Sequence, residues 1–200
     1  MEVFDQLAEK YQGEHSHNPF QAALVEKISS LTPAGSTVLD LGCGTGVPTA
    51  KILAESDHRV VGVDISEGML RLAREQVPAA EFRHADFKDL PADFGSFDAV
   101  TAFFSLLMLS KADIEKTLTK VAGWLKPGGY FGVGMVNFDG DSLPFDFLGV
   151  PVTVSGYLQP DLAALLESHG LTVVDIETVD FTPTDGPQES QIFALAQLPA

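Results

Sequence analysis

Three aspartates stand at the ends of apolar runs, and their type and spacing could do binding chemistry. Asp40 lies in the run 38–41, Asp64 ends the run 59–64, and Asp86 follows the alternating run 80–85. A carboxylate attracts a cationic group, and its two acceptor oxygens match a vicinal pair of hydroxyls. At intervals of 24 and 22 residues, these acids predict one site for a ligand that carries a positive charge and a diol.

Glycines alternate directly after Asp40, at Gly42, Gly44 and Gly46. Glycine permits backbone angles and a close ligand approach that a Cβ would block. The dinucleotide fingerprint needs its third glycine at a position that holds Val47 here, and the charge of Asp40 would repel a pyrophosphate. The pattern therefore argues against NAD and phosphates as ligands. A glycine turn with a purely structural role is the alternative.

The elements that must position these residues follow from hydrophobic periodicity. The run 38–41 suits a strand buried on both faces, and Pro48 with the run 49–54 predicts a helix directly after the glycine turn. The runs 59–64 and 80–87 predict two further strands, with a helix capped by Ser66 between them. Parallel strands joined in this way bring their carboxyl ends to one crevice. For Asp64, favouring the N-terminus of the following helix is the alternative role.

Three local patterns together resemble a known family. They are the acid followed after one residue by G-x-G-x-G at 40–46, "FDAV" at 97–100 and "LKPGG" at 125–129. In these patterns the chain is similar to the class I S-adenosylmethionine-dependent methyltransferases, and the likeness extends over residues 36–198. The resemblance implies S-adenosylmethionine as the cofactor and S-adenosylhomocysteine as its product.

The resemblance also implies an α/β, Rossmann-like fold for a single domain, 1–200. We expect a seven-stranded, mostly parallel sheet in the order 3-2-1-4-5-7-6 with helices on both faces. Residues 1–34 would form an N-terminal helical cover, beginning with a helix over 4–12, and residues 36–136 the cofactor-binding core. The stretch 137–158, irregular in pattern, would be a substrate lid, and residues 159–198 the last helix and a closing hairpin with its last strand antiparallel.

Carried over residue by residue, the resemblance assigns a set of cofactor-binding positions. Asp64 would hold the ribose hydroxyls, Asp86 and the backbone of Phe87 the adenine, and Ile65 and Met69 would flank the ring. The whole set is Tyr11, Asp40, Gly42, Cys43, Gly44, Asp64, Ile65, Met69, Asp86, Phe87 and Phe103. For Tyr11 and Met69, ordinary packing is the alternative role.

Candidates for a catalytic base are His15, His17 and Tyr157, with Asp139 as a further possibility. The spacing of the two histidines suits a loop, where two solvated side chains with no catalytic role are the alternative. No metal site is expected. A base is needed only when the acceptor atom carries a proton that must leave.

Apolar residues mark the acceptor side of the predicted crevice. The fourth strand ends near Phe103 and continues into an apolar run over 104–109, while aromatic residues recur in the stretch 137–158. A pocket built from these would favour an apolar or aromatic acceptor, although many of them would simply pack the core.

Composition excludes several other functions. The formal charge of −16 would repel nucleic acid and anionic membrane surfaces, and no apolar run is long enough to span a membrane. The single cysteine, Cys43, rules out an internal disulfide and is expected to be a small buried residue of the turn. We expect one cytoplasmic domain, monomeric or homodimeric, that binds a small-molecule acceptor.

The function that follows is methyl transfer from S-adenosylmethionine to an O, N or C atom of a small, apolar or aromatic molecule. Two alternatives stay open: an enzyme of another class, such as a cyclase or isomerase that leaves the cofactor intact, and a binding module without turnover.

Overall fold

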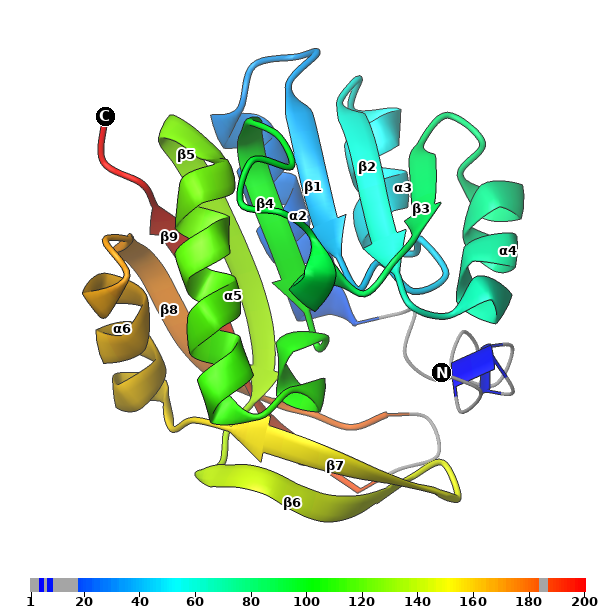
Figure 1. Cartoon of the computed structure of the whole chain (residues 1–200), viewed down its shortest axis with the longest axis vertical. Coiled ribbons are helices and arrows are strands. Elements are labelled where there is room, and N and C mark those ends of the chain that lie inside the picture. The colour runs from blue at the N-terminus through cyan, green and yellow to red at the C-terminus, as the bar shows by residue number, and fades with distance from the viewer. Residues whose placement is uncertain (1–3, 6, 9–17, 184–186) are drawn as a thin grey trace.

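A seven-stranded sheet forms the centre of the computed structural model, which describes residues 4–5, 7–8, 18–183 and 187–200. Its strand order is β3-β2-β1-β4-β5-β9-β8, and it is parallel except for β9, which runs antiparallel to both neighbours (Figure 1). The strands are β1 (Thr37–Leu41), β2 (Arg59–Asp64), β3 (Glu81–His84), β4 (Phe97–Phe103), β5 (Leu125–Val136), β8 (Thr172–Phe181) and β9 (Glu189–Gln197). Because β6 and β7 form a separate hairpin, β8 and β9 are the sixth and seventh strands of this sheet, and the predicted order is confirmed.

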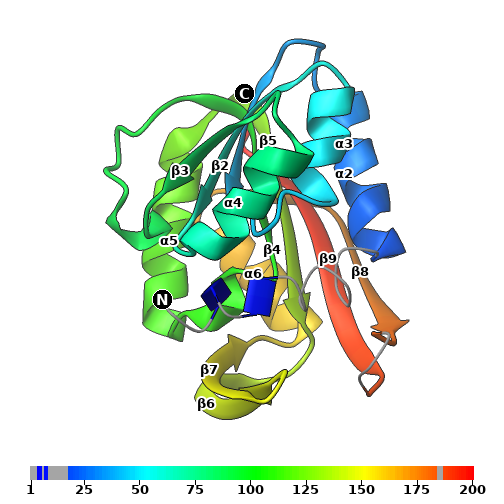
Figure 2. The ribbon, with the colours of Figure 1, turned by 90° about the vertical axis from the view of Figure 1, so that its right-hand side faces the viewer.

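Helices cover both faces of the sheet, as Figure 2 shows from the side. On one face lie α2 (Pro19–Leu31) and α3 (Thr49–Glu55); on the other lie α5 (Lys111–Trp124) and α6 (Gln159–Ser168). The helix α4 (Glu67–Gln76) packs against β2 and β3. Two short 3₁₀ helices, η1 (Phe87–Asp89) and η2 (Leu106–Met108), follow β3 and β4.

The central strands are apolar on both sides because both sides are covered. Val38 on β1 packs into the core beside α2 and α3, whereas the next residue, Leu39, packs into the core beside α5 and α6. Both side chains are fully buried. A continuous apolar run is therefore needed here, in place of the alternation of a strand with one solvated face.

Side chains of Asn18, Ser66 and Ser110 cap α2, α4 and α5 and fix where these helices begin. Ser66 is the cap predicted from the sequence. In the described part of the chain, no helix has the length and apolar character that crossing a membrane requires.

The N-terminal region is described in part. Phe4, Asp5, Leu7 and Ala8 are helical, and the rest of the predicted helix over 4–12 lies outside the described residues. The next helix, α2, packs Leu24, Val25 and Ile28 onto the sheet, so it covers a sheet face and only its first turn reaches the crevice.

The stretch 137–158, expected to be irregular, is mostly a β-hairpin. Strands β6 (Gly140–Phe147) and β7 (Val150–Gly156) pair antiparallel below the carboxyl ends of the parallel strands (Figures 1 and 2). The prediction of an irregular stretch was wrong. Proline cannot donate to a strand ladder, so Pro144 and Pro151 favour a loop when the sequence is considered alone. Each strand of a two-stranded ribbon is an edge, however, and an edge tolerates proline.

Two strand boundaries also differ from the prediction. The sequence predicts the fifth strand over 130–136, after "LKPGG", but β5 begins at Leu125, directly after α5, so Pro127 and the two glycines lie within the strand. β3 ends at His84, and Asp86 therefore caps η1 beyond the strand. Local sequence does not determine either boundary, since both depend on pairing with a neighbouring strand.

The packing of α5 against the sheet generates a stability prediction. Leu118→Ala, at a fully buried position, should lower the free energy of unfolding by about 2–5 kcal/mol through lost burial and the cavity left behind. Glu115→Ala, on the exposed side of the same helix, should change it by no more than about 0.5 kcal/mol. Urea unfolding of both variants measures the difference, and equal effects would contradict the described orientation of α5.

Candidate functional site

The glycine turn after β1 has the backbone that the sequence predicted. Gly42, Gly44 and Gly46 all have positive φ, at 68°, 53° and 79°. A Cβ on Gly42 would lie 2.3 Å from Cβ of Ser105, at the end of β4. Ser105 Oγ in turn donates a hydrogen bond to the carbonyl of Leu41 at 2.7 Å. The turn can therefore lie against β4 only because Gly42 has no side chain.

Asp40 is a buried acid with one free carboxylate oxygen. Thr101 Oγ1, on β4, donates to its Oδ1 at 2.7 Å, whereas Oδ2 is buried and makes no hydrogen bond with any described residue. Burial raises the pKa of Asp40 from 3.8 to about 7, against the lowering effect of the Thr101 hydrogen bond, and the nearby charge of Asp64 raises it further. A buried acceptor of this kind calls for a donor, and a cation would satisfy it best.

A small pocket opens beside Asp40. Its lining residues are Gln21, Asp40, Gly42, Cys43, Gly44, Thr45, Val47, Thr49 and Phe103. Thr45 Oγ1 is also buried and, within the part of the chain that the structure describes, has no hydrogen-bond partner. The cavity measures about 20 Å³, which is room for one group the size of water or ammonium. The pocket thus fits a small cationic group, and a larger ligand would have to continue along the strand ends.

Asp64 joins the glycine turn to the start of α4. Its Oδ2 accepts from the backbone N–H of Gly44 at 2.8 Å, and its Oδ1 accepts from the N–H of Ser66 at 2.9 Å. Burial raises the pKa of this carboxyl, while hydrogen bonds from the backbone N–H groups lower it in part. Each oxygen retains a second lone pair, so the group can still accept from a diol.

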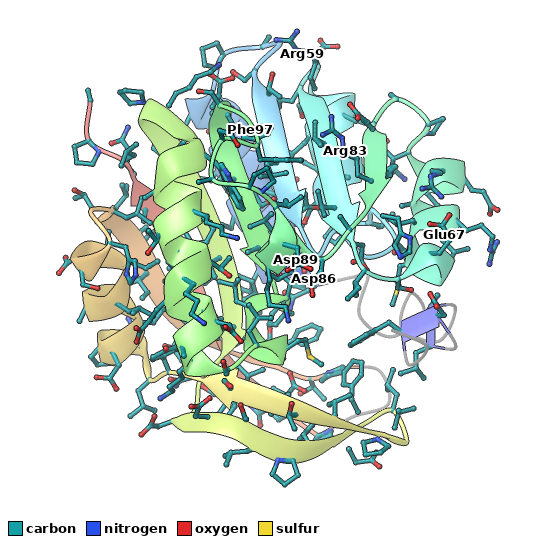
Figure 3. The ribbon with its side chains drawn as sticks, viewed as in Figure 1. Arg59, Glu67, Arg83, Asp86, Asp89 and Phe97 are labelled. Carbon is teal, nitrogen blue, oxygen red and sulfur yellow. The ribbon has the colours of Figure 1, made fainter. Side chains whose placement is uncertain are left out.

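Asp86 lies at the same edge of the sheet, one strand further out. Figure 3 places it beside Asp89 near the carboxyl ends of the strands, whereas Arg59, at the start of β2, lies at the opposite end. Its Oδ1 accepts from the N–H of Lys88 at 2.9 Å, and Lys88 Nζ lies 3.3 Å from Oδ2. Asp86 therefore remains close to the crevice but outside the small pocket.

The predicted positions between these acids differ in exposure. Ile65 is 36% exposed and Phe87 is half-buried, so both can offer apolar surface at the crevice. Met69 is 3% exposed and points into the fold. Its packing role, the alternative weighed from the sequence, is the one that this burial favours.

The end of β4 contains a strained residue. Phe104 has a φ of +53°, a conformation that L-residues rarely adopt, and its N–H donates to the carbonyl of Gly134 at 2.8 Å. The resulting turn leaves Phe103 lining the pocket and brings Ser105 back toward Leu41. Such strain persists where surrounding contacts hold it, most often at functional sites.

Cys43 is a buried member of the pocket lining, 8% exposed. Burial raises the pKa of its thiol, as do the charges of Asp40 and Asp64. The side chain therefore stays a neutral thiol, which agrees with a small buried residue of the turn.

Neither of the two candidate bases that the structure describes, Tyr157 and Asp139, lines the pocket. Tyr11, His15 and His17 lie outside the described residues. Tyr157 belongs to the core with Leu106 and Leu162 and does not line the pocket, and burial raises its pKa to about 12. A phenol with this pKa holds its proton at neutral pH, which argues against its role as a base.

Asp139 is also unsuited to act as a base, because it pairs at 2.6 Å with Lys111 on the surface. Among the described residues, no three His, Cys, Asp or Glu side chains are grouped in a way that could hold a metal ion.

Sequence reasoning missed Gln21 as a pocket residue. Its Nε2 donates to Thr49 Oγ1 at 3.0 Å, so the first turn of α2 is joined to the start of α3 beside Asp40. A signal existed: Gln21 precedes Leu24, Val25 and Ile28 at the spacing of one helical face, and a polar residue on a buried face needs a partner. Thr45, Val47 and Thr49 were missed because only the fold brings them to the same cavity.

A parallel sheet whose first strand enters a glycine turn, with acids at three neighbouring strand ends, defines a nucleoside-binding α/β protein of the Rossmann-like class. The model of the methyltransferase domain family matches residues 38–129, from β1 to the glycines of β5. These residues include both the glycine turn and the three acids.

Two relatives have similar sequences. A demethylmenaquinone methyltransferase of Symbiobacterium thermophilum is 36% identical over 65% of this chain, and the match covers 56% of the relative, so the chain spans little more than half of its length. The O-methyltransferase rstn1 of Aspergillus nomiae is 31% identical over 80% of this chain and 73% of its own. On this evidence the chain belongs to the S-adenosylmethionine-dependent methyltransferases, as the sequence patterns predicted.

The fold is also that of solved methyltransferases. The 1,6-didemethyltoxoflavin-N1-methyltransferase of Burkholderia thailandensis, solved with S-adenosylhomocysteine and 1,6-didemethyltoxoflavin bound, matches with a TM-score of 0.74 at 21% identity. The match covers 100% of this chain and 87% of the other.

The residues present fit the cofactor of the family. S-adenosylmethionine carries an ammonium, a sulfonium and a ribose diol. The free Oδ2 of Asp40 and the unpaired hydroxyl of Thr45 offer buried acceptors, Gly42 leaves the turn accessible, and Asp64 keeps acceptor capacity at the neighbouring strand end. The site therefore has acceptors where a cationic nucleoside needs them.

The contact at Gly42 generates a matched test. Gly42→Ala and Gly35→Ala both place a side chain at positive φ, but nothing lies within 4 Å of the added Cβ at Gly35. Both should lose roughly 1 kcal/mol of stability to backbone strain. Gly42→Ala should lose about 1–3 kcal/mol more because its Cβ meets Ser105. Urea unfolding measures both losses, and equal losses would contradict the close approach of the turn to β4.

Proposed function

We propose that this chain transfers the methyl group of S-adenosylmethionine to an O, N or C atom of a small, apolar or aromatic molecule. The observation that carries the proposal is the buried Asp40 with a free Oδ2, next to a glycine turn that has no bulk to exclude a ligand. When bound, the cofactor supplies a methyl group on a sulfonium, which is already activated for substitution.

In this proposal Asp40 and Thr45 receive the ammonium end of the cofactor, and Gly42 to Gly44 line its path. Asp64 accepts the ribose hydroxyls, and Asp86 with the N–H of Phe87 binds the adenine beside Ile65. The order of these groups follows the order of strands β1, β2 and β3 along one edge of the sheet. Family membership and the free acceptors in the pocket support the assignment.

One face of the β6–β7 hairpin is apolar, which favours an apolar acceptor molecule. In the register of β6 and β7, Leu143 faces Val154, Phe145 faces Val152 and Phe147 faces Val150. Residues two apart on a strand share a face, so these six side chains form one apolar face of the ribbon. Leu143 is 45% exposed and Phe145 is 48% exposed. We infer that this face covers the acceptor, as the lid predicted for 137–158 would.

Catalysis by positioning is the mechanism that these residues favour. The apolar hairpin face and the apolar end of β4 would exclude water from the methyl acceptor, and the strand ends would orient the two reactants. Tyr157 and Asp139 do not line the pocket. We therefore propose an acceptor atom that needs no base, or one that loses its proton to water or to His15 or His17, which lie outside the described residues. We further propose a small-molecule acceptor, in preference to nucleic acid or membrane, for a monomeric or homodimeric cytoplasmic protein.

A ligand melt followed by a turnover assay tests the proposal. S-adenosylhomocysteine at about 100 times its Kd should add about 2.7 kcal/mol of stability, which raises the Tm by roughly 5–10 °C. NAD should give no shift. Conversion of S-adenosylmethionine to S-adenosylhomocysteine should then require an apolar or aromatic acceptor.

The possible outcomes of that assay separate the alternatives. A shift with NAD and none with S-adenosylhomocysteine would overturn the proposed cofactor. Binding without any methyl release across a panel of aromatic and apolar acceptors would favour a cyclase, an isomerase or a binding module over a methyltransferase.

The raised pKa of Asp40 generates a pH prediction. With a pKa of about 7, Asp40 is protonated at pH 6, and an ammonium placed beside it favours the charged carboxylate. Binding should therefore release up to one proton at pH 6 and tighten as the pH rises from 6 to 7. Calorimetry of S-adenosylhomocysteine in two buffers of different ionisation enthalpy counts the protons.

Asp40→Asn is the control, because it keeps an acceptor for Thr101 but cannot titrate. It should bind with no proton release and with weaker affinity. If the wild-type protein releases no proton, or if the variant releases as many, Asp40 does not receive the ammonium.

A further inference from the structure

The N-terminal helical residues contact both sides of the crevice. Asp5 Oδ1 accepts hydrogen bonds from Ser66 Oγ at 2.6 Å and from the N–H of Gly68 at 2.8 Å. One residue earlier, the ring of Phe4 lies 6.3 Å, centroid to centroid, from the ring of Phe147, at an angle of 47°. Two adjacent residues thus connect the start of α4 to the tip of the hairpin.

The contact at α4 is built for a close approach. A Cβ on Gly68 would lie 2.9 Å from both Cα and the carbonyl oxygen of Asp5, which are backbone atoms that cannot easily move aside. Figure 3 marks this end of α4 by Glu67, beside the N-terminal helical residues. Leu7 and Ala8 are buried, at 7% and 3% exposure, so the segment is packed onto the molecule.

The contact continues into the cofactor crevice through hydrogen bonds. Ser66, which donates its hydroxyl to Asp5, also donates its N–H to Asp64 Oδ1, and Asp64 Oδ2 accepts from Gly44. Asp64 is the group to which the proposed function assigns the ribose. A ligand that holds Asp64 and Ser66 in place therefore also holds in place the Ser66 hydroxyl that binds Asp5.

We propose that Asp5 is a positioning residue that couples the cofactor side of the crevice to the hairpin. By holding the N-terminal segment on α4, Asp5 places Phe4 against Phe147. The cofactor and the hairpin therefore each stabilise the state in which this segment is bound to the rest of the molecule. The inference rests on the proposed function for its ligand, and it adds a link between the two binding sides. Coupling of this kind is reciprocal, because each site shifts the same equilibrium of the docked segment.

Two variants break the link from opposite sides. Asp5→Ala removes the acceptor, and Gly68→Ala blocks the approach of the segment with a Cβ while leaving Asp5 intact. Alanine is the better helix former, so the helix propensity of α4 by itself predicts that Gly68→Ala stabilises the helix, and displacement of the segment by the added Cβ opposes this gain. The coupling predicts weaker binding from the same change.

Two further variants serve as matched controls. Asp5→Asn keeps a side-chain oxygen that can accept from both donors, and should retain most of the effect. Gly123→Ala makes the same chemical change as Gly68→Ala within α5, where nothing lies within 4 Å of the added Cβ. Ligand-free melts and circular dichroism of all four variants verify that each is folded.

The experiment measures the Kd of S-adenosylhomocysteine by calorimetry and the amide exchange of residues 140–156 with and without this ligand. Asp5→Ala and Gly68→Ala should raise the Kd about tenfold, as expected for lost hydrogen bonds to a charged group. In the wild type, Asp5→Asn and Gly123→Ala, the ligand should protect the hairpin amides from exchange. In Asp5→Ala and Gly68→Ala, this protection should be lost.

If wild-type protein binds the ligand but Asp5→Ala and Gly68→Ala keep either its Kd or the ligand-dependent protection of the hairpin, the coupling is overturned and the proposed function stands. If wild-type protein fails to bind the ligand, the proposed function is overturned and the coupling with it.

Discussion

The carboxylate of Asp64 is the group on which the geometry of the crevice depends. It accepts the N–H of Gly44 from the turn after β1 and the N–H of Ser66 before α4, so two neighbouring strand ends are tied through one side chain. Burial of this acid costs stability, and the charge-assisted hydrogen bonds offset part of that cost. Because Ser66 also binds Asp5, the same carboxylate connects the glycine turn to the N-terminal segment.

Asp40 illustrates how a binding site departs from the rules of a stable core. Its neighbours satisfy one oxygen and leave the other buried without a partner among the described residues, and burial raises the pKa of Asp40 to about 7. Nearby, Phe104 holds a strained φ of +53°. Features of this kind lower stability, and they are expected where a ligand completes the hydrogen bonds.

The two sides of the crevice are constructed differently. Consecutive strands of the sheet form the side to which we assign the cofactor, where parallel register and the buried hydrogen bonds of Asp64 hold the strand ends in place. The β6–β7 hairpin, inserted between β5 and α6, is the side that we propose for the acceptor, and its apolar face is half-exposed. A ribbon outside the core can change its side chains at little cost to folding, so acceptor preference can vary while the cofactor side stays the same.

The sequence by itself determined the sheet and the glycine turn after β1. Apolar runs such as 38–41 can be stable only when both faces are covered, and Gly42, Gly44 and Gly46 permit the positive φ values that the turn adopts. Only the tertiary structure decided which residues share the small pocket. Gln21 lines the same pocket as Asp40 because α2 packs beside α3. The β6–β7 hairpin formed where an irregular stretch was expected, because both of its strands are edges that tolerate proline. Local periodicity predicts which residues are buried, but it does not predict which residues each of them contacts.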